Sequence, residues 1–236
     1  TGALDWTAGL SIPTSALLRR VSCDSDANVY IVGDSDVSVD IGQNALGGID
    51  VFLIKMNSTG SVMWKRVFGS SSDDFVRGVD TDALRAVYVV GYTGSNEVPG
   101  PSSAVDFRTG FRMTTPWDGA TGEGGREAFV AKFSPTGQLT WSTLLGTSWN
   151  DQADAVSVNE VGGVHIVGRT DSSSNSDATF VVKLSSAGDL LWTQVLGENA
   201  SQIQGAGISA RGNGVAVVVT SDFASAEVML STITSS

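Results

Sequence analysis

The sequence predicts an all-β protein made of repeated units of four antiparallel strands. One pattern occurs three times in the 236 residues: VFLIKMNSTGSVMW (Val51–Trp64), AFVAKFSPTGQLTW (Ala128–Trp141) and TFVVKLSSAGDLLW (Thr179–Trp192). In each copy, alternating apolar residues flank a short Ser/Thr-Gly break, which is typical of a β-hairpin. A second strand–turn–strand follows each copy, for example AVSVNEVGGVHIVGRT. Four strands in about 50 residues indicate a β-propeller blade.

Labelling the strands a to d shows how the blades are distributed along the chain. In the third repeat, a is AVSVN, b is VHIVGRT, c is TFVVKLS and d is LLWTQVLG. The chain opens with a lone d strand, Leu4–Leu10, and closes with a c strand, Val228–Thr234. We therefore expect a single domain spanning residues 1–236. It would be a β-propeller with four blades of four antiparallel strands, closed by the N-terminal strand d pairing with the C-terminal strands a-b-c. The alternative is that the repeats continue in a longer parent chain.

A lysine and a tryptophan recur nine residues apart in the repeated hairpin. We expect the Trp rings to fill gaps between blades, because a large ring buries much apolar area. A lysine within a strand is expected to point outward, with its stem along the apolar surface. Both types are thus interpreted as structural. The residues concerned are Lys55, Lys132, Lys183, Trp64, Trp141 and Trp192.

Composition and charge exclude several classes of function. A net charge of −11 argues against nucleic-acid binding, which needs clustered Lys and Arg. No apolar run reaches the roughly 20 residues of a membrane span. The single cysteine, Cys23, allows no internal disulfide. Asn57 and Asn199 each begin an Asn-x-Ser/Thr sequon, which would accept a glycan in a eukaryotic secretory pathway.

In a propeller, the d–a and b–c connections share one face, and most acidic residues of this chain fall in those connections. We expect that face to be electronegative and to favour cations or basic partners. The alternative is that charges gather there only because loops are solvated. Asp73, Asp74 and Asp151 are the acidic candidates for binding.

The longest connection is the second b–c loop, an insertion spanning Thr93–Glu127. Loops of this length are often functional. This loop and the following d–a loop combine aromatic and arginine residues, as contact surfaces do. The same side chains would alternatively fold back and plug the ring. The candidate binding residues are Phe107, Arg108, Phe111, Arg112, Trp117 and Trp149.

The sequence offers little for metal binding or catalysis. One His and one Cys cannot supply a usual zinc or copper ligand set, so no metal ligands are assigned. Calcium is the one cofactor left open, in Asp24–Asn28, Asp34–Asp40 or Asp171–Asp177, although the first lacks the Gly and Glu of a calcium loop. His165 alternates with Val and Ile in strand b and is predicted to be packed. Paired carboxylates alone remain as acid/base candidates.

The repeat resembles the β-propeller repeat family of secreted and surface proteins, and more loosely the NHL-type propellers. Members read like GG-x-DAFVAKFS-x-x-G, WSTLLG, D-x-A-x-AV-x-V and G-x-VYV-x-G. The matching positions here are Gly124, Gly125, Ala128–Ser134, Gly137, Trp141–Gly146, Asp151–Val158 and Val164–Gly168. The resemblance implies a propeller and an extracellular or cell-surface location. It implies no catalytic residues.

Three functions follow as expectations. The first is a non-enzymatic interaction or structural module: a building block or adhesive domain of an extracellular assembly, with protein partners or cell-surface glycans. The second is a carbohydrate-binding lectin that uses Trp117 or Trp149. The third is a glycan-cleaving enzyme with two carboxylates on the acidic face.

Overall fold

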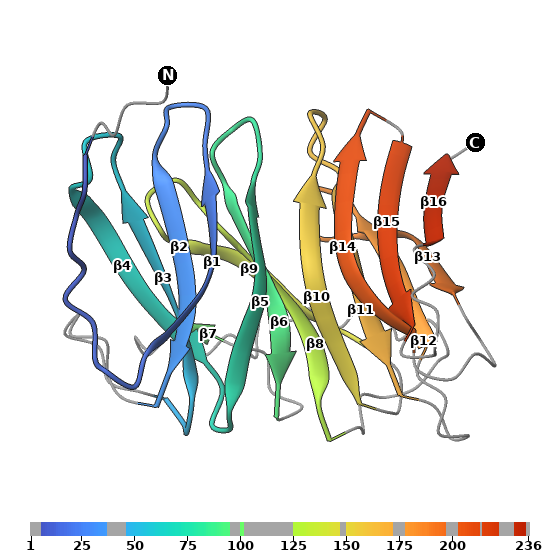
Figure 1. Ribbon diagram of the computed structural model, residues 1–236, viewed down its shortest axis with the longest axis horizontal. Coiled ribbons are helices and arrows are strands. Elements are labelled where there is room, and N and C mark those ends of the chain that lie inside the picture. Colours follow the sequence, from blue (N-terminus) through green and yellow to red (C-terminus); the bar gives the residue numbers. More distant parts are fainter. Residues whose placement is uncertain are drawn as a thin grey trace.

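The computed structural model describes residues 6–36, 46–94, 100–101, 125–146, 150–171, 178–196, 203–212, 214–221 and 229–234. Within these ranges no helix occurs and every strand pairing is antiparallel, so the all-β prediction is confirmed (Figure 1). The strands are β1 Leu17–Cys23, β2 Val29–Ser35, β3 Asp50–Met56, β4 Val62–Gly69, β5 Asp74–Thr81, β6 Val87–Thr93, β7 Gly100–Pro101, β8 Glu127–Phe133, β9 Leu139–Leu145, β10 Asp151–Val158, β11 Val164–Thr170, β12 Ala178–Leu184, β13 Leu190–Leu196, β14 Ile203–Arg211, β15 Gly214–Ser221 and β16 Met229–Thr234.

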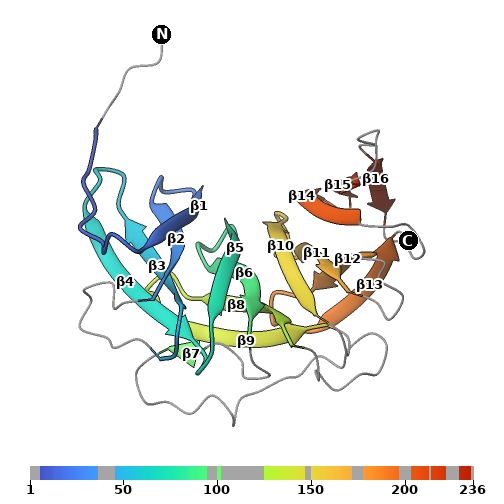
Figure 2. The same cartoon turned by 60° about the horizontal axis from the view of Figure 1, so that its bottom comes forward.

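The strands form four sheets that follow one another along the chain. Their orders are β1-β2-β3-β4-β7, β5-β6-β8-β9, β10-β11-β12-β13 and β14-β15-β16. In Figure 2 the sheets stand side by side along an arc, with β1, β5, β10 and β14 on its inner side and β4, β9 and β13 on its outer side. The predicted a-b-c-d unit is therefore present in the first three sheets, in chain order from the inner to the outer strand.

The hydrophobic core lies between neighbouring sheets. Phe68 of β4 meets Phe129 and Phe133 of β8, with ring centroids 6.2 and 4.9 Å apart. Between the third and fourth sheets, Val181 packs in one cluster with Val217. Each buried Phe contributes about 1.5–3 kcal/mol by leaving water, so the sheets are held together mainly by apolar burial.

The repeated tryptophans join each sheet to the next, as predicted. Trp64 Nε1 donates to the carbonyl of Pro135 at 3.1 Å, and Trp141 Nε1 donates to Ser186 at 3.2 Å. Each ring lies against the turn glycine of the following hairpin, Gly137 (φ 79°) or Gly188 (φ 88°). A side chain there would be strained by the positive φ and would meet the ring, which explains the recurring glycine.

The prediction that the repeated lysines point outward is wrong for Lys55, whereas Lys132 and Lys183 are half-buried. Lys55 is 4% exposed, and its Nζ lies 3.6 Å from Asp24 Oδ2 and 4.9 Å from the centre of the Tyr30 ring. The same Nζ donates to the carbonyl of Pro135 at 3.3 Å. Tyr30 completes the group by donating its hydroxyl to Asp24 at 2.9 Å.

The second sheet repeats this Lys–Asp–Tyr group. Lys132 Nζ lies 3.8 Å from Asp82 and 4.9 Å from the centre of the Tyr88 ring, and it donates to the carbonyl of Ser186 at 2.9 Å. Tyr88 donates to Asp82 at 3.0 Å. A buried ammonium needs such partners, because an unpaired charge is costly away from water.

The third sheet departs from this pattern. Asn159 and His165 stand where the first two sheets have Asp and Tyr. His165 is fully buried, as predicted, and among the described residues neither ring nitrogen finds a hydrogen-bond partner. Burial, with the charge of Lys183 adding to it, lowers the pKa of His165 to about 4. The imidazole is therefore neutral at physiological pH.

The predicted ring closure is not found. The last sheet has three strands, and Trp6–Leu10, the described part of the predicted N-terminal d strand, has no strand structure. The first and last sheets stand at opposite ends of the arc (Figure 2). Trp6 lies instead against Gly60 of the β3–β4 turn. That contact copies Trp64 on Gly137, so the segment keeps the packing of a d strand without its pairing.

The second b–c connection contributes one short strand. Its described residues Gly100 and Pro101 form β7, which pairs with Gly69 and Phe68 at the outer edge of the first sheet. A segment predicted as a loop thus extends the first sheet by hydrogen bonding.

Candidate functional site

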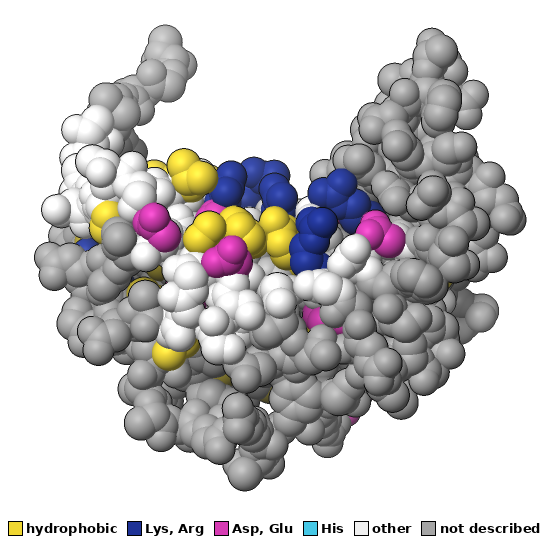
Figure 3. Space-filling model, turned by 90° about the horizontal axis from the view of Figure 1, so that it is seen from below, with side chains coloured by type: hydrophobic (Ala, Val, Ile, Leu, Met, Phe, Trp, Pro, Cys, Tyr) yellow, Lys and Arg dark blue, Asp and Glu magenta, His cyan; other side chains and the backbone are white. Residues whose placement is uncertain are grey.

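The inner strands line a hollow on the face of the d–a and b–c connections, where Figure 3 shows basic side chains gathered. Strands β1, β5 and β10 each have a β-bulge near their start. A bulge adds one residue without a partner on the next strand and redirects its side chain. The added residues are Arg19, Arg77 and Asp154. Three of the four inner strands therefore present a charged residue at their bulge.

The carboxylate of Asp154 has three arginines around it. The charges of Arg169, Arg77 and Arg20 all favour its ionised form, yet burial outweighs them and raises the pKa of Asp154. Gln152 Nε2 donates to Oδ1, whereas Oδ2 is buried without a hydrogen-bond partner among the described residues. One acid is thus shared by several guanidinium groups, which leaves a local excess of positive charge.

The ring of Tyr92 on β6 lies beside both Arg77 and Arg126, and Arg126 belongs to the connection that leads into β8. Arg77 and Arg126 both lie over the Tyr92 ring, 5.5 and 5.6 Å from the centre, and Phe75 stacks on it at 4.9 Å. Cation–π contacts of this kind orient guanidinium groups. In the described part of the chain, Arg77 Nε is buried and makes no hydrogen bond. The hydrogen-bonding capacity of this guanidinium group is therefore not fully used by the described residues.

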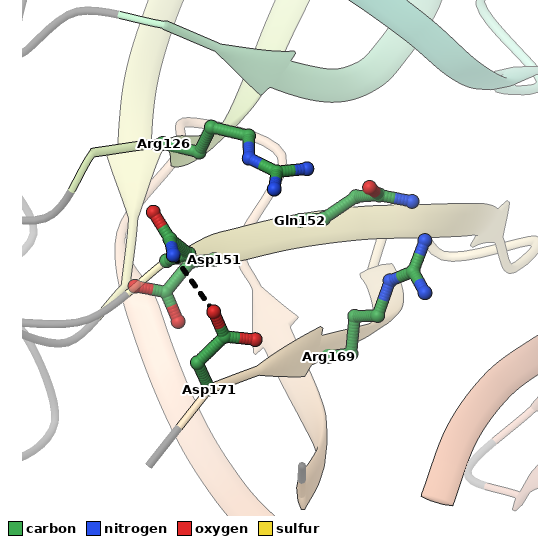
Figure 4. A pocket seen from close by; sticks show the side chains of 6 residues that line it. Arg126, Asp151, Gln152, Arg169 and Asp171 are labelled. Atoms are coloured by element: carbon green, nitrogen blue, oxygen red, sulfur yellow. Dashed lines mark hydrogen bonds between the residues drawn. The ribbon is translucent and has the colours of Figure 1, made fainter. Parts of the chain in front are cut away.

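A polar cavity of about 120 Å³ opens beside this cluster (Figure 4). The main chain fixes its walls, because Asp151 N donates to Arg126 O at 2.8 Å and Asp171 N donates to Asn150 O at 2.9 Å. Asn150 Nδ2 also donates to Asp171 Oδ2 at 2.7 Å. Arg126, Asn150, Asp151, Gln152, Arg169 and Asp171 line the cavity.

We call Arg20, Arg77, Arg126 and Arg169 with this cavity the arginine hollow. Guanidinium groups present forked N–H donors that match carboxylate or phosphate oxygens. The four guanidinium groups outnumber the carboxylates of Asp154, Asp151 and Asp171 at this position, which suits an anionic group of a ligand.

Two of the three acidic candidates for binding are buried, and the electronegative face as a whole stays a prediction. Asp74 and Asp151 are 0% and 1% exposed, so neither is a surface ligand. Asp73 is exposed and accepts a hydrogen bond from Ile49 N at 2.8 Å. Burial raises the pKa of Asp74 to about 6, against the hydrogen bonds that it accepts, and the charge of Asp50 adds to the rise. Acidic residues at the strand starts are thus buried, and arginines occupy the hollow.

The other predicted site residues have different outcomes. Asn57 lies in the β3–β4 turn, where its Oδ1 accepts hydrogen bonds from Thr59 and Ser61, and its glycosylation stays a prediction. Asp24 of the first calcium candidate is engaged by Asn28 and Tyr30 instead. Seven further candidates lie outside the described residues: Phe107, Arg108, Phe111, Arg112, Trp117, Trp149 and Asn199.

Sequence reasoning missed the arginine hollow because it sorted only the acidic residues by face. The signal that could have found the arginine hollow lies in the positions of the arginines along their strands. Arg19 and Arg77 each follow the residue that pairs with the glycine of strand b, namely Gly33 or Gly91, and Arg169 lies near the end of a b strand on the same face. A bulge in each a strand could not be read from alternation alone.

Comparison of the chain with models of known families and with curated protein sequences finds no match. The resemblance to the β-propeller repeat family therefore stays an interpretation of the sequence. In the described ranges, no helix has the length and hydrophobicity of a bilayer span.

Proposed function

We propose that this protein is a non-enzymatic interaction module whose arginine hollow binds a carboxylate-bearing segment of a partner. The observation that supports this most directly is Arg77, whose Nε is buried without a hydrogen bond in the described structure, beside Arg20 and Arg169. An unpaired buried donor costs about 1–3 kcal/mol, which a bound anion would recover. An extracellular or cell-surface assembly is the setting that we propose from the sequence.

The charge of the whole chain limits the kinds of ligand that suit the arginine hollow. With a net charge of −11, the protein repels long polyanions at a distance. A local basic hollow in an acidic molecule therefore suits one or a few negative groups, as in an acidic peptide or a uronic acid, rather than nucleic acid.

Binding to the arginine hollow is tested with two probes, a fluorescent hexaglutamate peptide and a labelled trigalacturonate. We expect Arg169→Gln to weaken binding of the recognised probe by about tenfold or more, equivalent to ~1.4 kcal/mol. Anisotropy titration at two salt concentrations measures this, and binding should weaken as salt rises.

Arg211→Gln is the matched control, because this side chain is 93% exposed at the β14–β15 turn. It should leave affinity unchanged. Recognition of the peptide alone indicates a protein partner, and recognition of the oligosaccharide alone indicates a glycan. Failure of both probes to bind, or equal affinities for wild type and Arg169→Gln, would contradict the proposal.

We also propose that the sheets close into a four-bladed propeller, with Trp6–Leu10 as the outer strand of the last blade. Two observations support closure. Trp6 already packs on Gly60 as a d-strand tryptophan does. Trp192 Nε1 is buried without a partner among the described residues, whereas Trp64 and Trp141 each donate to the following hairpin. Closure would place the arginine hollow around the central channel.

A designed disulfide tests closure. In the last sheet, Ser231 of β16 pairs with Val217 of β15. In the third sheet, Val182 of β12 holds the equivalent position, because it pairs with Ile166 of β11. On its other side, Val182 pairs with Thr193 of β13. By the same register Thr7 should face Ser231. In a Cys23→Ser background, we expect Thr7→Cys with Ser231→Cys to cross-link under mild oxidation, detected by non-reducing electrophoresis and mass spectrometry. The pair of Thr7→Cys with Thr232→Cys, one residue out of register, should cross-link far less. Absence of a difference between the two pairs would refute closure by this pairing.

A further inference from the structure

Two carboxylates are buried together where the first sheet meets the second. Asp50 begins β3 and Asp74 begins β5, and their side chains are 3% and 0% exposed. Both approach Gly69 at the end of β4: a Cβ on this glycine would collide with Asp50 Oδ1 and would lie 2.7 Å from Asp74 Oδ2. The absence of a side chain at Gly69 thus leaves space between the two acids.

In the part of the chain that the structure describes, only one oxygen of each carboxylate accepts hydrogen bonds. Asp50 Oδ2 accepts a hydrogen bond from Leu46 N at 2.7 Å, and Asp74 Oδ2 accepts from Ser70 N at 2.6 Å and Ser70 Oγ at 3.0 Å. Among the described residues, Oδ1 of each acid is buried without a hydrogen-bond partner. No described lysine or arginine forms an ion pair with either acid.

Two buried like charges without a counter-charge are strongly unfavourable, so either a proton or a bound cation must compensate for them, and burial raises the pKa of both acids. We propose that a calcium ion binds between Asp50 and Asp74. The described side-chain groups that could bind a cation here are oxygens, namely the two carboxylates and the Ser70 and Thr93 hydroxyls; these two hydroxyl oxygens lie 3.1 Å apart. Calcium prefers such hard oxygen ligands, and zinc and copper do not.

The same arrangement occurs at the next junction. A Cβ on Gly146 would lie 2.5 Å from Asp151 Oδ2 and 2.8 Å from Glu127 Oε2. Glu127 pairs with Thr93 in the sheet register as Asp50 pairs with Ser35. Two junctions therefore carry a buried carboxylate pair around a glycine.

The third sheet shows that the β-sheet itself does not need an acid here. Ala178 pairs with Thr170 and so holds the position that Asp50 and Glu127 hold in the first two sheets. The strand β12 begins at this alanine. An acid at the start of strand c is therefore dispensable for strand pairing. Its presence in the first two sheets calls for a different explanation, which a bound cation provides.

The test is a calorimetric titration of the metal-free protein with calcium chloride, together with thermal unfolding in calcium chloride and in EGTA. We expect calcium to bind and to raise Tm. Asp74→Asn keeps the shape of the side chain and removes its charge. This variant should lose one bound calcium ion per chain, or bind it at least about tenfold more weakly, and should unfold at a higher temperature than wild type in EGTA because the repulsion is relieved.

Asp26→Asn is the control, since this side chain is 53% exposed in the turn between β1 and β2, and it should bind calcium as wild type does. Because the readouts in EGTA need no ligand, a variant that fails to fold is recognised directly. Calcium binding that Asp74→Asn leaves unchanged, or no binding to wild type, would overturn the proposal. A Tm increase with magnesium equal to that with calcium would overturn the assignment to calcium.

Discussion

Replacing Asp24 with alanine is expected to lower the free energy of unfolding by about 3–5 kcal/mol. The change leaves the Lys55 ammonium buried without a counter-charge and the Tyr30 hydroxyl without its acceptor. It also removes the acceptor for Asp26 N and Asn28 N, both at 3.0 Å, which closes the turn between β1 and β2. Urea unfolding at pH 7 measures the loss.

Asp26→Ala is the control for this prediction. Asp26 lies two residues away, pairs with Arg85 and has a side chain that is 53% exposed, so its removal should cost less than about 1 kcal/mol. In the Asp24→Ala background, Lys55→Met should recover part of the stability, because an apolar side chain no longer needs a counter-charge. Equal losses for Asp24→Ala and Asp26→Ala would show that the buried group is not what stabilises this sheet.

The strands and hairpins could be predicted because their signals are local. Alternation, a turn glycine and a fixed spacing identify the hairpin Ala128–Trp141 without knowledge of any distant residue. The position of the Trp rings also followed, since a ring of that size at a repeated position must be buried somewhere between repeats.

The buried lysines could not be predicted from their own strands. A lysine among alternating apolar residues is normally placed at the surface, and the Asp that holds Lys55 inside lies in a turn 31 residues earlier. A comparison between repeats carries the missing signal. Asp24 and Tyr30 are six residues apart, as are Asp82 and Tyr88, and in both repeats a lysine follows in strand c.

The arginine hollow and the carboxylate pairs depend on how sheets are placed relative to one another. Asp50 and Asp74 belong to different sheets, and nothing in either strand indicates that both meet Gly69. Arg77 and Arg126 meet over Tyr92 at the second sheet, where the bulge in β5 brings Arg77 to that side. Such contacts require the twist, spacing and bulges of the sheets, which local sequence patterns leave undetermined.

His165 is expected to make the protein sensitive to mild acid. Its pKa is about 4 in the folded protein because of burial, against an ordinary value near 6.5 in an unfolded chain. Between pH 6.5 and about 4, the His165 side chain therefore binds a proton in the unfolded state but not in the folded state. The stability that depends on neutral His165 is fully present above pH 6.5, and about 2–3 kcal/mol of it is lost as the pH falls to 4.

The double variant Asn159→Asp with His165→Tyr tests the cause of this loss, because it copies the Asp and Tyr of the first two sheets beside Lys183. The geometry suits the change: the His165–Trp192 centroid distance is 6.3 Å, and the Tyr30–Trp64 distance is 6.1 Å. Between pH 6.5 and 4, the unfolding free energy of the double variant should decline by about 2–3 kcal/mol less than that of wild type, measured by urea unfolding at each pH. Parallel pH profiles for the two proteins would exclude His165 as the source of the acid sensitivity.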